Sequence, residues 1–300
     1  MTTTRRQLAV LVLLTLVWGL NWPVMKVGVS GLPGQPQPYP PLLFRSVSMF
    51  LGLPVLGAAL VMLKIPLALP RAQWLPMAKL ALPNMIVWHT IVIVSVQQLS
   101  SGRAAILGYS MPIFAALWGW LAFGDRLGAR QFTGVAAAGL GVLLLLAHEF
   151  GKLSGAPLAA LGMLAAAAVW AWGTHKLRRA VTPVPLLTLV FWMTALTATV
   201  VGLLSVAIER PRWAWPPAHT ATAIVFNAVA IFGFAHAAWF YLARTMPPVA
   251  SSVSVMLIPV LGTFSGAYFL GEALHWQDFA SMVLMVVAIA SVLLPSRTGR

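Results

Sequence analysis

The sequence predicts an all-α integral membrane protein with ten transmembrane helices, arranged as two inverted repeats of five helices each. Three observations lead to this class. Of the 300 residues, 60% are hydrophobic and only 8% are charged, and the chain resembles itself at an offset of 147 residues. A water-soluble domain carries about 25% charged residues, so this chain has too few to cover itself with polar surface. It has no cysteine, which excludes disulfides and cysteine metal sites.

Ten apolar stretches approach the roughly 20 residues that a membrane-spanning helix needs. The first follows Arg5 and Arg6, but it is longer than a signal-peptide core and lacks a small-residue cleavage pattern, so we interpret it as a retained span. No connector is long enough to join a separate soluble domain. The predicted spans are Leu8–Val27, Leu42–Met62, Trp74–Val96, Arg103–Phe123, Gln131–Ala147, Pro157–His175, Pro185–Ala207, Ala218–Leu242, Val249–Leu270 and Trp276–Leu294.

The chain has a net charge of +14, and its basic residues stand singly or in pairs between apolar runs. This placement indicates how the helices are oriented in the membrane rather than nucleic-acid binding. With both termini in the cytoplasm, 13 of the 19 Lys and Arg residues lie inside and 6 lie outside. Cytoplasmic loops of membrane proteins carry the excess of basic residues. We therefore predict an integral protein of a bacterial inner membrane with both ends inside.

The internal similarity divides the chain into residues 1–150, with spans 1 to 5, and residues 151–300, with spans 6 to 10. An odd number of spans in each half gives the halves opposite orientations in the membrane. Inverted repeats are typical of alternating-access transporters, which hold their substrate near the midplane between the halves. The matched positions are Pro112 with Pro259, Gly119 with Gly266, Gly124 with Gly271, Asp125 with Glu272, Leu127 with Leu274 and His89 with His236.

The turns Gly124-Asp125-Arg126-Leu127 and Gly271-Glu272-Ala273-Leu274 resemble the two EamA repeats of the drug/metabolite transporter superfamily. The stretch Val17-Trp18-Gly19-Leu20-Asn21 and Arg45 are similar to positions that recur in that family. The resemblance covers the whole chain. It implies ten helices around a central cavity, lined chiefly by spans 1, 3, 4, 6, 8 and 9. Tyr109-Ser110-Met111-Pro112 and Trp170 look like the pattern of YddG-type aromatic amino acid exporters.

Several chemistries have no support in the sequence. It contains no Gly-x-x-x-x-Gly-Lys-Ser/Thr loop, no His-Glu-x-x-His helix and no Gly-x-Ser-x-Gly elbow, so we predict neither an ATP-driven pump nor an enzyme, and no cofactor or metal. The five acids lie at span ends or in loops: Asp125, Glu149, Glu209, Glu272 and Asp278. Carboxylates near the membrane centre mark ion and proton relays. Their absence there favours a neutral or zwitterionic, partly apolar substrate.

Asp125 and Glu272 close short turns, where an acid just before a helix favours its positive N-terminal end. Arg45, Arg103 and Lys26 are placed toward the outer side. We expect them to extend to the lipid headgroups, although one of them has the alternative role of binding a substrate carboxylate at the outer mouth. Pro112 and Pro259 are matched across the repeat and predict paired hinges in spans 4 and 9; fixed bends are the alternative.

Polar and aromatic side chains inside the spans form the candidate site. Trp18 and Trp22 share a face of span 1, and such a lining would stack flat apolar groups while Asn, His and Tyr orient polar ones. For the two histidines, an interhelical hydrogen bond and a role in transport remain alternatives; for the tryptophans, bundle filling or contact with lipid is the alternative. The predicted substrate-binding residues are Trp18, Asn21, Trp22, Trp88, His89, Tyr109, Trp170, His236 and Trp239.

The predicted function is secondary, facilitative export of a small metabolite by alternating access, with amino acids, aromatic ones first, as the substrate class. The expected partners are that substrate and the lipid bilayer, without nucleic acid, and a monomer is plausible. One alternative is another carrier of the superfamily, for a nucleotide sugar or a lipid-linked sugar, which would need basic residues deep in the cavity. A non-transporting membrane protein or enzyme is the other alternative.

Overall fold

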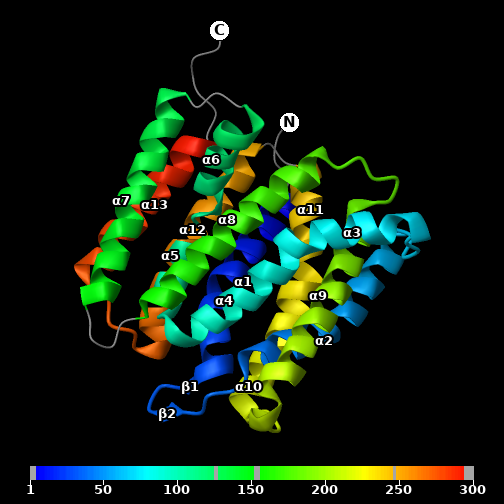
Figure 1. Ribbon diagram of the computed structural model, residues 1–300, viewed down its shortest axis with the longest axis horizontal. Helices are drawn as coiled ribbons and strands as arrows, with labels where there is room; N and C mark the ends of the chain where they lie inside the picture. Colours follow the sequence, from blue (N-terminus) through cyan, green and yellow to red (C-terminus); the bar gives the residue numbers. More distant parts are fainter. Residues whose placement is uncertain (1–4, 125–127, 152–155, 246–247, 294–300) are drawn as a thin grey trace.

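The computed structural model describes residues 5–124, 128–151, 156–245 and 248–293 of the chain. They form a helical bundle with one short β-hairpin (Figure 1). The first half comprises α1 Arg5–Ser30, β1 Gly31–Leu32, β2 Gln35–Pro36, α2 Pro41–Met62, η1 Arg71–Gln73, α3 Trp74–Ala81, η2 Leu82–Ile86, α4 Val87–Gln98, α5 Ser101–Gly108, α6 Met111–Phe123 and α7 Ala129–Gly151. The second half comprises α8 Pro157–Arg179, α9 Leu186–Glu209, η3 Arg210–Arg212, α10 Ala218–Phe226, η4 Asn227–Ala235, α11 His236–Thr245, α12 Pro248–Leu270 and α13 Trp276–Leu293.

Eight helical segments are long and apolar enough to cross a membrane, and they coincide with the first eight predicted spans. The all-α membrane class is thereby confirmed. The last two predicted spans fall on α12 and α13, where the apolar helices found are shorter, Leu257–Leu270 and Trp276–Ser291. The total of ten crossings therefore stays a prediction.

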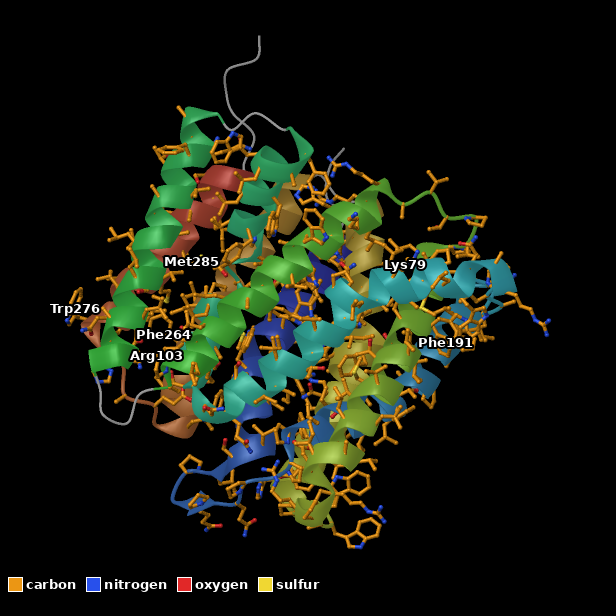
Figure 2. The ribbon with its side chains drawn as sticks, in the orientation of Figure 1. Lys79, Arg103, Phe191, Phe264, Trp276 and Met285 are labelled. Carbon is orange, nitrogen blue, oxygen red and sulfur yellow. The ribbon has the colours of Figure 1, made fainter. Side chains whose placement is uncertain are left out.

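The outside of the bundle is apolar. Leu121, Leu143 and Leu203 are each more than 60% exposed, which a protein surrounded by water would avoid over so large a surface. Figure 2 shows Trp276 at the edge of the bundle, pointing away from it, at the start of α13. The exposed leucines fit contact with lipid chains, and a tryptophan at a helix end fits the headgroup region.

The predicted span Arg103–Phe123 is two helices, α5 and α6, separated at Tyr109 and Ser110. Pro112 has no N–H to offer the carbonyl of Gly108, which removes one helical hydrogen bond at the point where α5 ends. Pro112 instead lies in the first turn of α6, where a missing donor costs nothing. Its repeat counterpart, Pro259, lies inside the uninterrupted helix α12.

Two spans contain a π-helical segment, and a histidine follows each of them. Segment η2 precedes α4, whose third residue is His89, and η4 runs directly into His236. In each region an asparagine side chain donates to the carbonyl four residues earlier: Asn84 to Leu80 at 2.8 Å and Asn227 to Ala223 at 3.1 Å. Widened turns of this kind occur frequently at functional sites.

Helices from the two halves of the chain lie against one another throughout the bundle. Helix α7 packs on α13, α2 on α9, and α1 on α12, while α4 and α8 pack together in the middle (Figure 1). The start of α1 and the end of α13 lie at one end of the bundle, and the β1–β2 hairpin lies at the other. We call the latter the hairpin end; it corresponds to the predicted outer side.

Candidate substrate-binding site

The structure distributes the predicted site residues over helices of both halves. Trp18, Asn21 and Trp22 lie on α1, Trp88 and His89 on α4, Tyr109 between α5 and α6, Trp170 on α8, and His236 and Trp239 on α11. The predicted hinge residues Pro112 and Pro259 lie on α6 and α12. Each aromatic contact below therefore joins two elements, and most of them join the two halves.

Trp22 and Trp88 both approach Gly108, the last residue of α5, and each contacts a further aromatic residue. The Trp22 ring meets Tyr109 edge-on with 6.2 Å between centroids, and the Trp88 ring lies 6.4 Å from that of Trp170. A Cβ atom on Gly108 would lie 2.8 Å from the Trp22 ring and 3.5 Å from that of Trp88. A larger residue at this position would force the Trp22 ring to shift, whereas Trp88 would make an ordinary contact. We call Trp22, Trp88, Tyr109 and Trp170 the aromatic group.

The next turn of α1 makes a separate contact with the second half. The ring of Trp18 lies 5.5 Å from that of Trp239 on α11. Between the two tryptophans of α1, Asn21 has its Oδ1 atom buried without a hydrogen-bond partner. A buried polar atom without a partner costs about 1–3 kcal/mol. Oδ1 of Asn21 is therefore an acceptor to which a ligand can donate.

The two repeat-related histidines face a common phenylalanine. The ring of Phe232, in η4, lies 5.5 Å from that of His89 and 5.9 Å from that of His236, against which it stacks. Nδ1 of His236 lies 3.1 Å from the carbonyl oxygen of Ile231. A carbonyl can only accept, so this nitrogen carries the proton. Phe232 could not be singled out from the sequence, because it is one apolar residue in a long apolar run.

The expectation that Arg45 extends to the headgroups is wrong. Its side chain is 2% exposed, and it lies between α1 and η4 because that face of α2 packs into the bundle. Nη1 donates to Oδ1 of Asn227 at 3.3 Å, and Nη2 lies 2.7 Å from the sulfur of Met25. The ring of Phe232 lies 5.7 Å from the guanidinium carbon. Arg45 thus joins the histidine region to α1.

Lys26 is likewise directed inward rather than to the headgroups. Its ammonium donates to the carbonyls of Val96 at 3.2 Å and Gln97 at 2.8 Å, at the C-terminal end of α4. A cation at that end of a helix meets the negative pole of the helix dipole and the carbonyls that lack helical partners. The same carbonyls explain why the side chain turns away from lipid.

Three carboxylates tie the halves together at the hairpin end. Glu272 accepts from the backbone N–H of Ser101 at 2.7 Å, so it caps α5 and not the helix that follows it in sequence. Glu209 accepts in the same way from Leu43 at 2.9 Å and so caps α2. The predicted interaction of an acid with a helix N-terminus is right in kind, but the helix belongs to the opposite half. Asp125 lies outside the described residues.

The third carboxylate, Asp278 at the start of α13, pairs with Arg103 of α5 at 2.8 Å between Oδ1 and Nε. Both side chains are less than 10% exposed. The expectation that Arg103 reaches the headgroups is therefore also wrong. A buried counter-ion holds this arginine, whereas sequence alone placed both residues at the ends of separate spans.

Comparison with known proteins gives a consistent result. The model of the EamA-like transporter family matches residues 6–147 and again residues 157–294. The chain is 23% identical to "Uncharacterized transporter YoaV" of Bacillus subtilis, over 92% of each chain. It is 27% identical to "Uncharacterized inner membrane transporter YedA" of Escherichia coli, over 94% of this chain and 88% of the other.

A "Probable amino-acid metabolite efflux pump" of Escherichia coli is 24% identical, over 95% of this chain and 94% of the other. Among solved structures, one titled "Crystal structure of protein" superimposes with a TM-score of 0.67 at 20% identity. That match covers 96% of this chain and 98% of the other, so the two share a fold.

Proposed function

The chain belongs to the EamA-like transporter family, and on that premise we propose that it is a secondary transporter that exports amino acids, aromatic ones included, by alternating access. The proposed mechanism is facilitative and involves rocking of two five-span halves, residues 1–150 and 151–300. The proposed location is a bacterial inner membrane, with both termini in the cytoplasm. One relative of this chain is named an inner membrane transporter, which supports that location.

The helix contacts support two halves related by a pseudo-two-fold axis, because they occur in pairs that exchange the halves. Helix α1 packs on α12 as α8 packs on α6, and α4 packs on α8 as α11 packs on α1. Corresponding helices run in opposite directions: α1 runs toward the hairpin end and α8 away from it (Figure 1). Gly124 and Gly271, 147 residues apart, both have positive φ, at 73° and 63°. These features support inverted repeats and ten spans.

The observation that carries the proposal is that the aromatic contacts cross between the halves. Trp18 contacts Trp239, and Trp88 contacts Trp170, and in each pair one residue comes from each half. A substrate bound among these rings would touch both halves and so respond to their relative motion. Indole rings offer flat apolar surfaces, and the unpartnered Oδ1 of Asn21 offers a polar contact. This combination suits an amino acid with a large apolar side chain.

Facilitative transport is supported by where the carboxylates lie. Among the described side chains, the acids are Glu209, Glu272 and Asp278, and each is hydrogen-bonded at the hairpin end. Proton-coupled carriers commonly use a carboxylate inside the membrane. The names of two relatives as probable amino-acid metabolite efflux pumps support the substrate class and the outward direction.

The test is uptake of labelled tryptophan, phenylalanine, threonine and lysine into liposomes that contain the purified protein, with and without a pH gradient. We expect saturable uptake of the aromatic amino acids, unchanged by the gradient, and at least a tenfold lower rate in Trp170→Ala. The matched control is Trp215→Ala, whose side chain is 95% exposed in the loop before α10 and should leave uptake unchanged.

Two results would overturn parts of this proposal. Uptake that requires a pH gradient would reject the facilitative mechanism and direct attention to His89 and His236. Absence of uptake for all four amino acids, with a correctly folded protein, would reject the amino acid assignment.

A further inference from the structure

We propose that Arg45 is the anion-binding residue of this transporter and that it binds the carboxylate of the substrate, while Oδ1 of Asn21 receives the substrate ammonium group. The inference rests on the proposed function, and it specifies which groups of the substrate are recognised and where. It begins from the partners of Arg45 in the interior of the bundle.

Arg45 is a buried cation whose described partners are all neutral. They are an amide oxygen of Asn227, the sulfur of Met25 and the face of the Phe232 ring. Nε of the guanidinium is buried and has no hydrogen-bond partner. A guanidinium offers five N–H groups in a planar fork that fits a carboxylate in a bidentate geometry. The present partners use only part of that fork.

The other buried arginine, Arg103, has its charge neutralised by a carboxylate of the same chain. Arg103 has Asp278 at hydrogen-bonding distance from two of its nitrogens, at 2.8 and 3.3 Å. Among the described residues, Arg45 has no carboxylate partner. An uncompensated charge inside a membrane protein is costly and is retained where it serves a function. A carboxylate brought by the substrate would supply the missing counter-ion.

The position of Arg45 suits a substrate that bridges the halves. It extends from α2 of the first half and donates to Asn227 of the second half. Through Phe232 it adjoins His89 and His236. A carboxylate bound here would therefore be sensed by both halves at once.

Asn21 completes the recognition of a zwitterion. It lies four residues before Met25 on α1, so both share a helix face, one turn apart. Met25 contacts Arg45, and Asn21 has an unpartnered acceptor. Asn21 thus lies about one helical turn, about 5.4 Å along α1, from the residue that contacts Arg45. An amino acid offers a carboxylate to the unpartnered donor of Arg45 and an ammonium group to the unpartnered acceptor of Asn21. The neighbouring Trp18 and Trp22 would then contact its side chain.

The test measures ligand binding to the purified protein in detergent through the shift of its melting temperature. L-Tryptophan is compared with tryptamine, which lacks the carboxylate, and with indole-3-propionate, which lacks the ammonium group. L-Leucine and isoamylamine form a second pair.

We expect the wild type to bind each amino acid at least tenfold more tightly than its amine. In Arg45→Gln this preference should fall to within about twofold, and Arg45→Lys should keep part of it. In Asn21→Leu the preference for tryptophan over indole-3-propionate should fall.

The matched control is Lys26→Gln, which removes one positive charge from a neighbouring position on α1 whose partners are backbone carbonyls. It should keep the carboxylate preference. A wild type without that preference, or a folded Arg45→Gln that retains it, would overturn the inference. Failure of Arg45→Gln to fold leaves the wild-type and Arg45→Lys comparisons decisive. A carboxylate preference without uptake in liposomes would reject the proposed transport but support carboxylate binding by Arg45. Uptake together with an unchanged preference in Arg45→Gln would support transport but reject carboxylate binding by Arg45.

Discussion

At the scale of single residues, the buried charges separate into two kinds. Arg103 and Asp278 neutralise each other at the hairpin end, with side chains only 9% and 4% exposed. Arg45 is buried at least as deeply, but its partners among the described residues are all neutral. Removing one member of a buried ion pair leaves the other uncompensated and costs about 3–5 kcal/mol. The first pair is therefore expected to stabilise the fold, and the lone arginine to serve binding.

We expect Arg103→Gln and Asp278→Asn each to lower the melting temperature by about 6–20 °C, from a loss of about 3–5 kcal/mol and a scale of about 2–4 °C per kcal/mol for domains of about 150–250 residues. The double variant should lose much less than the two single losses together, because no unpaired charge remains. Melting temperatures of the four proteins in one detergent, at one heating rate, provide the test. Additive losses would show that the two side chains do not stabilise each other.

At the scale of elements, helices α2 and α5 each receive an N-terminal cap from the opposite half of the chain. Glu209 provides the capping oxygen atoms of α2, and Glu272 adds to the local cap of α5, in which Ser100 accepts from the N–H of Arg103. A Cβ on Gly266 would collide with the side chains of Ser101 and Glu272, so this cap needs the glycine. Under the proposed rocking mechanism, opening of the hairpin end would break these contacts.

Replacing Glu272 with Ala should therefore increase amide hydrogen exchange in residues 99–108, with a loss of about 1–2 kcal/mol. The reason is that the N–H groups of Ser101 and Gly102 lose their acceptor. Glu209→Ala is the matched control, because it should affect residues 41–45 and leave 99–108 unchanged. Hydrogen exchange read by mass spectrometry of the two variants separates a local cap from a general loosening. If both variants changed hydrogen exchange equally in residues 41–45 and 99–108, the result would contradict the interpretation that each carboxylate caps one particular helix.

At the scale of the whole molecule, the proposed inverted repeats predict which side of the membrane each loop faces. The hairpin end should face outward, and the loops with most of the basic residues should face the cytoplasm. Gln35 in β2 and Ala273 between α12 and α13 are exposed at the hairpin end, and Arg71 is exposed before α3. The chain contains no cysteine, so a single introduced thiol reports its own side.

We expect an impermeant maleimide to label Gln35→Cys and Ala273→Cys in right-side-out vesicles, and Arg71→Cys only in inverted vesicles. The unchanged protein is the control and should not react. Labelling of Ala273→Cys from the cytoplasmic side would mean that α12 does not cross the membrane, which would reject the ten-span arrangement.

The site residues illustrate why prediction from the sequence went only part of the way. Trp18, Trp22 and the histidines stand out because polar and large aromatic residues inside apolar runs are few. Their partners could not be found in that way. Phe232 resembles every other apolar residue of its span, yet its ring lies between His89 and His236. Arg45 was placed at the headgroups because its distance from the end of the span favours that position, and only the packing of α2 against η4 turns it inward.

The membrane class, the positions of the first eight spans and the internal repeat could all be predicted from the sequence, because they follow from local hydrophobicity and from spacing along the chain. Three other properties arise only in the folded protein: which helix each carboxylate caps, which arginine has a counter-ion and which aromatic rings meet. Those outcomes depend on contacts between residues as far as 221 positions apart, as between Trp18 and Trp239. Such contacts exist only after the helices have packed, since burial then forces each polar group to find a partner or to remain available for a ligand.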